Sequence, residues 1–201
     1  ADIGAIGGRQ SLSYASLSAD DVHALVMHWS PRTSGWMACF CDDALIHVYR
    51  AAFADAGRFD FAAVPWLQHR PRLLGDGPGS GACHLMVARP RERRFMSWGS
   101  LPCWYGPTRG TEPGRHIGGK PLDIMRAIVR DYSRPGDLVC DPYAGGGTTA
   151  LACLTEGRRA IGAEVDPDTH AKATARLSTW QPSLFVPEIK AEAQDLFGGE
   201  S

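Results

Sequence analysis

A glycine-rich turn between an apolar strand and a helix is the segment of this sequence best suited to bind a ligand. Residues Val139 to Ala150 read VCDPYAGGGTTA. Gly145 to Gly147 allow the backbone to turn tightly and to approach a ligand without Cβ clashes, and the helix that follows presents unpaired N–H groups. Glu164 ends the next predicted strand about 20 residues further on, where nucleotide-binding α/β folds bind ribose hydroxyls. The pattern therefore predicts a nucleoside-binding site.

The residues before the turn restrict the kind of ligand. Asp141 and Pro142 precede the glycines, and a carboxylate there would repel a pyrophosphate but would suit a cationic ammonium or sulfonium group. The chain contains no G-x-x-x-x-G-K-[ST] sequence, which excludes a P-loop. Dehydrogenases share the turn and the ribose acid, so a nicotinamide-dependent oxidoreductase is one alternative.

The surrounding sequence alternates between short apolar runs and amphipathic stretches, which is typical of an α/β fold. From Lys120 the pattern predicts helix, strand, Gly-rich turn, helix, strand and helix, ending near residue 178. Before it, we expect a helix capped by Ser18 and Asp21, a helix capped by Asp42, and strands over 35–41, 59–66 and 82–90. Residues 91–119 have no clear period and are predicted to form a long loop.

The composition sets the class of protein. The chain has 201 residues, 44% of them hydrophobic, and a net charge of −1, which predicts one domain and excludes a histone-like basic protein. No apolar run reaches the roughly 20 residues of a membrane span. The six cysteines form no C-x-x-C pair, so we expect no metal site and a reducing, cytoplasmic setting.

Three segments resemble the DNA adenine-N6 and cytosine-N4 methyltransferases. DPYAGGGTT, from Asp141, is similar to the family's D-P-F-x-G-x-G-T-T motif, and RHIGGKPLDIM, from Arg115, is similar to its upstream H-x-x-x-K-P element. RRAIGAEVDPDTHAKATARL, from Arg158, is similar to the strand and helix that follow the motif. Together they cover roughly residues 115 to 178, in the family's order.

The resemblance implies the Rossmann-like α/β fold of S-adenosylmethionine-dependent methyltransferases, with a mixed sheet and helices on both faces. It implies that Lys120 and Pro121 shape the methionine end of the cofactor pocket and that Asp141 lies near the cofactor's amino group. It implies ribose binding by Glu164, with Asp166 a weaker candidate. The remaining implied cofactor residues lie in the turn and at the helix start: Pro142, Tyr143, Ala144, Gly145, Gly147 and Thr148.

The family's catalytic tetrapeptide, [Asp/Asn/Ser]-Pro-Pro-[Tyr/Phe/Trp], does not occur in this sequence. In one subclass the catalytic half precedes the cofactor half, so we expect the tetrapeptide just before Ala1. On this reading the single domain, 1–201, divides into the downstream part of the catalytic half (1–90), the loop (91–119), the cofactor half (120–178) and a tail (179–201).

The expected partner is double-stranded DNA. A basic cluster at the start of the long loop is the expected phosphate-contacting surface: Arg89, Arg91, Arg93 and Arg94. The alternative is a solvated rim paired with Glu92. The loop is short for recognising a DNA target by itself. A homodimer is therefore expected as one arrangement, in which a second subunit would contribute to target recognition. Pro102-Cys103 resembles the nucleophile of cytosine-C5 enzymes but precedes the cofactor turn, which disfavours that chemistry.

The predicted reaction is methyl transfer from S-adenosylmethionine to adenine N6 of a flipped base, as in restriction-modification systems. Cytosine N4 is the second choice of target. A non-catalytic DNA-binding remnant is the other alternative.

Overall fold

A computed structural model describes residues 17–72, 76, 78–92, 98–107 and 119–181. Its elements, in which η denotes a 3₁₀ helix, follow in chain order: α1 (Ala19–Trp29), η1 (Ser30–Arg32), β1 (Met37–Cys41), η2 (Asp43–Leu45), α2 (Ile46–Asp55), β2 (Arg58–Asp60), β3 (Val64–Arg72), β4 (Ser80–Pro90), α3 (Leu122–Tyr132), β5 (Leu138–Asp141), α4 (Thr148–Thr155), β6 (Arg159–Gly162) and α5 (Pro167–Ser178).

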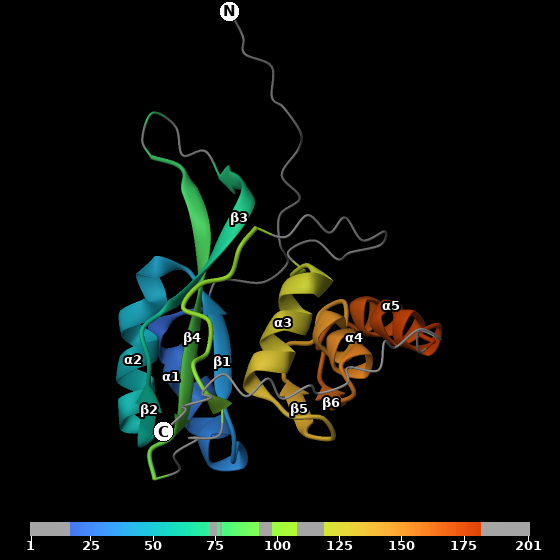
Figure 1. The fold of residues 1–201 in the computed structure, drawn as a ribbon, viewed down its shortest axis with the longest axis horizontal. Helices are drawn as coiled ribbons and strands as arrows, with labels where there is room; N and C mark the ends of the chain where they lie inside the picture. The colour runs from blue at the N-terminus through green and yellow to red at the C-terminus, as the bar shows by residue number, and fades with distance from the viewer. Residues whose placement is uncertain (1–16, 73–75, 77, 93–97, 108–118, 182–201) are drawn as a thin grey trace, which may run out of the picture.

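The strands of the described residues form two sheets. In the larger sheet the central strand β4 pairs antiparallel with β1 on one side and with β2 and β3 on the other. In the smaller sheet β5 and β6 are parallel. Helices α1 and α2 cover one face of the larger sheet and α3 the other, with α4 and α5 beyond it (Figure 1). The α/β fold with helices on both faces is confirmed, although parallel and antiparallel pairs lie in separate sheets rather than in one mixed sheet.

Strand β4 contributes to two hydrophobic cores because successive side chains point to opposite faces of a sheet. Met86 and Ala88 pack with residues of α1 and α2 on one face. Leu85 and Val87 pack on the other face with Ile124 and the next turn of α3. All four β4 side chains are at most 2% exposed. The strand therefore joins the first half of the chain to the helix that leads into the glycine-rich turn.

The single strand predicted over residues 59–66 is wrong, because the structure divides it into β2 and β3. Asp60 pairs with Ala88 and Val64 with Leu85. From Asp60 to Val64 the chain advances four residues, whereas β4 advances three between their partners. One extra residue opposite β4 defines a β-bulge. The extra residue interrupts the pairing after Phe61, whose backbone N–H still donates to the Val87 carbonyl at 3.1 Å. Hydrophobic periodicity in one sequence does not reveal such an insertion.

The other predicted elements are confirmed to within a few residues. Ser18 and Asp21 form the predicted capping box of α1, with the Asp21 backbone N–H donating to Ser18 Oγ at 3.2 Å. Asp42 precedes η2, and its side chain makes no capping hydrogen bond. Within the described ranges, no helix combines the length and apolar character needed to cross a bilayer.

Arg58, at the start of β2, is a buried cation that holds the connection between α1 and β1. It is 2% exposed. Its guanidinium donates to the carbonyl of Ser30 at 3.1 Å, that of Thr33 at 3.1 Å and that of Gly35 at 2.5 Å. The Ser30 carbonyl also accepts from the Thr33 backbone N–H at 3.3 Å, whereas the Thr33 and Gly35 carbonyls lie in the connection after η1.

Replacing Arg58 with Met should therefore remove a donor from the partly buried Thr33 and Gly35 carbonyls. We expect the free energy of unfolding to fall by about 3 kcal/mol, measured by urea denaturation. Arg50→Met, an exposed change on α2, should alter the unfolding free energy by less than about 0.5 kcal/mol. Equal effects of the two changes would contradict the assigned role of Arg58.

The glycine-rich turn packs closely against β6 and α5. A Cβ on Gly162 would lie 2.9 Å from the Ala144 Cβ and 3.3 Å from the Asp141 carbonyl oxygen. Gly147 has φ +74° and begins α4. A Cβ there would meet the Ala173 side chain at 3.3 Å. Glycine is therefore required at Gly162 for close approach and at Gly147 for the left-handed conformation.

We predict that Gly162→Ala destabilises the protein by about 1–3 kcal/mol, because neither neighbouring atom belongs to a flexible side-chain end that could move away. Gly35→Ala is the matched control, since a Cβ there meets nothing within 4 Å. Thermal unfolding of the two variants measures the difference. An unaltered melting temperature for Gly162→Ala would show that the turn can withdraw from β6.

Candidate cofactor-binding site

A crevice of about 230 Å³ lies at the carboxyl ends of β5 and β6. It is lined by residues of the glycine-rich turn and by those that follow β6: Pro142, Tyr143, Ala163, Glu164 and Val165. Ligands of open α/β sheets bind outside the carboxyl ends of the strands. The structure thus brings the predicted turn and the predicted ribose acid to one site.

Asp141 is oriented by its own turn. One carboxylate oxygen accepts from the Tyr143 backbone N–H at 3.0 Å, and the other accepts from Thr149 Oγ1 at 2.5 Å. Each carboxylate oxygen has a second lone pair, so a ligand cation can bind without displacing these donors. Thr149 was not predicted as a site residue, although its place in the first turn of the helix is a usable signal.

Glu164 connects the turn to the loop after β6. Its Oε2 accepts from the Gly145 backbone N–H at 2.9 Å, and its Oε1 accepts from the Asp166 backbone N–H at 2.9 Å. Because both donors are backbone groups, the carboxylate is fixed at the crevice without depending on another side chain. The predicted ribose-binding acid therefore also stabilises the glycine-rich turn by accepting its backbone N–H.

Two apolar side chains stand exposed beside the crevice. Tyr143 is 64% exposed and Val165 is 97% exposed. Exposed apolar groups that flank a polar crevice can hold a flat heterocycle by contact on its faces. Val165 was missed because one valine after a strand carries no periodic signal, yet its position directly after the ribose acid points to it.

Helix α5 supports the turn from the other side. Arg176 donates to the Gly146 carbonyl at 2.9 Å and to Thr148 Oγ1 at 3.2 Å. Thr148 is 7% exposed, so its hydroxyl is occupied within the fold. The predicted candidate Asp166 serves as the N-cap of α5, accepting from the Thr169 backbone N–H at 2.7 Å.

Lys120 and Pro121 lie directly before α3. Pro121 is buried and is the N-cap of that helix. The Lys120 ammonium lies 5.0 Å from the centre of the Phe40 ring on β1, within the range of a cation–π contact. Leu122 packs in the same apolar cluster as Val139 of β5, which brings this element to the strand that ends in Asp141. Phe40 was not predicted as part of the site.

The predicted DNA-contacting arginines lie only partly within the described residues. Arg93 and Arg94, like His116 of the H-x-x-x-K-P element, fall outside them. Arg89 lies 4.6 Å from the Phe59 ring centre, and Arg91 donates to the Arg58 carbonyl at 3.3 Å. They follow Ala88, which pairs with Met37 at the amino end of β1. Their contact with DNA stays a prediction.

The cysteines show no arrangement for metal binding or for a nucleophile beside the crevice. Across the described ranges, no group of three His, Cys, Asp or Glu side chains could hold a metal ion. Cys103 is exposed, in the segment that pairs with β3 through Tyr105. Burial raises the pKa of the Cys153 thiol to about 11, so this α4 side chain serves as a core residue.

Comparisons with known proteins find similarity to DNA methyltransferases. Residues 91–175 match the DNA methylase family. The type II methyltransferase M.XycI of Xanthomonas campestris pv. cyanopsidis is 29% identical over 145 residues, covering 64% of this chain and 48% of M.XycI. The chain therefore spans about half the length of that relative.

Solved structures with a similar fold include two methyltransferases. The M1.HpyAVI–SAM complex aligns with a TM-score of 0.65 and 22% identity, covering 77% of this chain and 81% of that one. The cytosine-N4-specific PvuII DNA methyltransferase aligns with a TM-score of 0.58 and 14% identity, covering 86% of this chain and 76% of that one. At these identities the likeness shows the fold, that of the α/β methyltransferases. In sequence over residues 91–175 and in fold, the chain is similar to DNA methyltransferases.

Proposed function

We propose that this chain binds S-adenosylmethionine and forms the cofactor-binding part of an enzyme that methylates an exocyclic amino group of a base in DNA. The observation that carries the proposal is the pair of oriented carboxylates, Asp141 and Glu164, at the carboxyl ends of adjacent parallel strands. The M1.HpyAVI complex, whose fold is similar, contains this cofactor. The family match supports DNA as the substrate.

Residues in the crevice and in the neighbouring segments would suit such a cofactor. Glu164 offers fixed acceptors for two ribose hydroxyls, and Tyr143 and Val165 offer apolar contacts for the adenine ring. Asp141 offers a negative charge for the ammonium group, and Lys120 and Pro121 enclose the methionine end. When bound, the cofactor supplies the methyl group. The chain's own residues orient the cofactor. Holding the methyl donor in place beside the target base makes the transfer effectively unimolecular, which increases its rate.

The choice of target base follows the same chemistry. Adenine N6 is the proposed acceptor and cytosine N4 the alternative, since both are exocyclic amino groups that lose one proton on methylation. The basic cluster that begins at Arg89 would contact the phosphates. The nicotinamide-dependent alternative requires a pyrophosphate beside the turn, and the Asp141 carboxylate disfavours it.

Binding of S-adenosylhomocysteine tests the cofactor proposal directly. We expect the chain to bind it in titration calorimetry, and Glu164→Gln or Asp141→Asn to weaken binding about 10- to 150-fold, the worth of one charge-assisted hydrogen bond. Asp168→Asn, an exposed change in the first turn of α5, should bind normally. Tight binding of NADH with none of S-adenosylhomocysteine would refute the proposal.

Methyl transfer tests the reaction. The full-length gene product, incubated with radiolabelled S-adenosylmethionine and duplex DNA, should label the DNA, and nuclease digestion should yield N6-methyladenine. N4-methylcytosine would select the alternative target. Unlabelled DNA from a full-length product that binds the cofactor would favour the non-catalytic remnant.

A further inference from the structure

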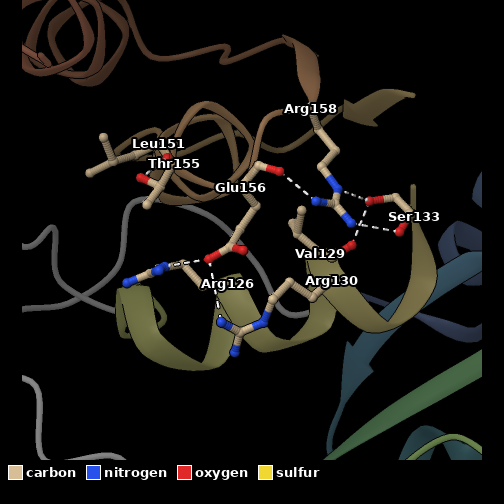
Figure 2. Close-up of polar contacts among 8 residues, drawn as sticks. All are labelled: Arg126, Val129, Arg130, Ser133, Leu151, Thr155, Glu156 and Arg158. Atoms are coloured by element: carbon tan, nitrogen blue, oxygen red, sulfur yellow. Dashed lines mark hydrogen bonds and ion pairs between the residues drawn. The ribbon is translucent and has the colours of Figure 1, made fainter. Parts of the chain in front are cut away.

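Helices α3 and α4 lie side by side and run in the same direction. Ser133 caps the carboxyl end of α3, and Glu156 caps that of α4. Arg158 contacts both caps, so these two ends are adjacent (Figure 2). The opposite ends hold the two parts of the cofactor site, because α3 begins after Pro121 and α4 begins after Gly147. The relative position of the helices therefore sets the spacing between these parts.

The apolar contact between the helices does little to fix that position. Its buried members on α4 are Ala152 and Cys153, which face Val129, Leu122 and Met125 of α3. Small side chains form shallow ridges, and Met is flexible. A helix can shift along such a surface at little cost in packing, so another interaction must set the register.

The first polar contact is made by Glu156. Its side chain is 10% exposed, and Oε1 lies 2.6 Å from Arg126 Nε and 3.5 Å from Arg130 Nη1. Arg126 and Arg130 are four residues apart, so they share one face of α3, and Figure 2 shows both reaching the same carboxylate oxygen. A mostly buried carboxylate with two cationic partners resists displacement, because separation would leave its charge uncompensated.

The second polar contact is made by Arg158, which is 9% exposed. Its Nε donates to Ser133 Oγ at 3.0 Å and its Nη2 to the Ser133 carbonyl at 2.8 Å. Its Nη1 donates to the Glu156 carbonyl. Ser133 Oγ in turn donates to the Val129 carbonyl at 2.5 Å. One planar guanidinium thus ties the ends of both helices and leaves no freedom in their separation.

We propose that these two contacts, which we call the α3–α4 clamp (Arg126, Arg130, Ser133, Glu156 and Arg158), position the Lys120–Pro121 element against the glycine-rich turn and thereby set cofactor affinity. The clamp residues are positioning residues, since none of them lines the crevice. This inference rests on the proposed cofactor-binding function.

A double-mutant cycle tests the clamp. In the full chain, Glu156→Gln should raise the Kd for S-adenosylhomocysteine about tenfold, and Arg126→Gln should act similarly. The double variant should bind no more weakly than the worse single variant, because both changes break one contact. Arg130→Gln, whose partner is more distant and whose side chain is 52% exposed, should raise Kd about threefold and should fold even if Glu156→Gln does not.

Arg159→Gln is the matched control. Its guanidinium is exposed and donates to the Gly136 carbonyl at 3.2 Å, outside the clamp. We expect an unchanged Kd. Clamp variants with a lower unfolding free energy but an unchanged Kd would overturn the proposal, since a purely structural role predicts that result. A wild-type chain that binds no S-adenosylhomocysteine would refute the proposed function instead.

Hydrogen exchange tests the clamp without a ligand. In the ligand-free chain, Glu156→Gln should increase amide exchange at residues 120–125 and 143–147. These residues lie at the helix ends that are far from Glu156. Faster exchange confined to residues 130–134 and 155–158 would show that the clamp acts only locally and would overturn the proposal, whatever the affinity for the cofactor.

Discussion

The close approach of the glycine-rich turn to β6 is the constraint on which the site depends. The Ala144 backbone N–H donates to the Ala163 carbonyl at 2.8 Å, and the Gly145 N–H donates to Glu164. A side chain on Gly162 would force the turn away from β6, because its Cβ would lie 2.9 Å from the Ala144 Cβ. The missing Cβ at Gly162 therefore lets the turn after β5 and the residues after β6 line one crevice.

The segment from β5 to α5 could be predicted from the sequence because its signals are local. Strand, turn and helix follow one another between Leu138 and Ser178, and each boundary has its own glycine, proline or acidic cap. The same holds for α1, where Ser18 and Asp21 form a capping box. Such signals depend on neighbours within a few residues, and tertiary packing agrees with them here.

What could not be predicted depends on contacts between distant segments. The bulge between β2 and β3 is defined only against β4, and the place of Phe40 beside Lys120 depends on how β1 meets α3. Arg176 supports the turn from 30 residues away in the sequence. A single sequence shows composition and period but not which faces meet, so residues that act across elements were missed while those within one element were found.

The two acids of the crevice are held by donors from the chain itself, and this affects the thermodynamics of binding. Because Asp141 and Glu164 are already oriented by the Tyr143, Gly145 and Asp166 backbone N–H groups, little conformational entropy remains to be lost at these side chains when a ligand arrives. Much of the ordering has been completed during folding. Changes in backbone stability around the turn should therefore appear in ligand affinity even where no contacting side chain is altered.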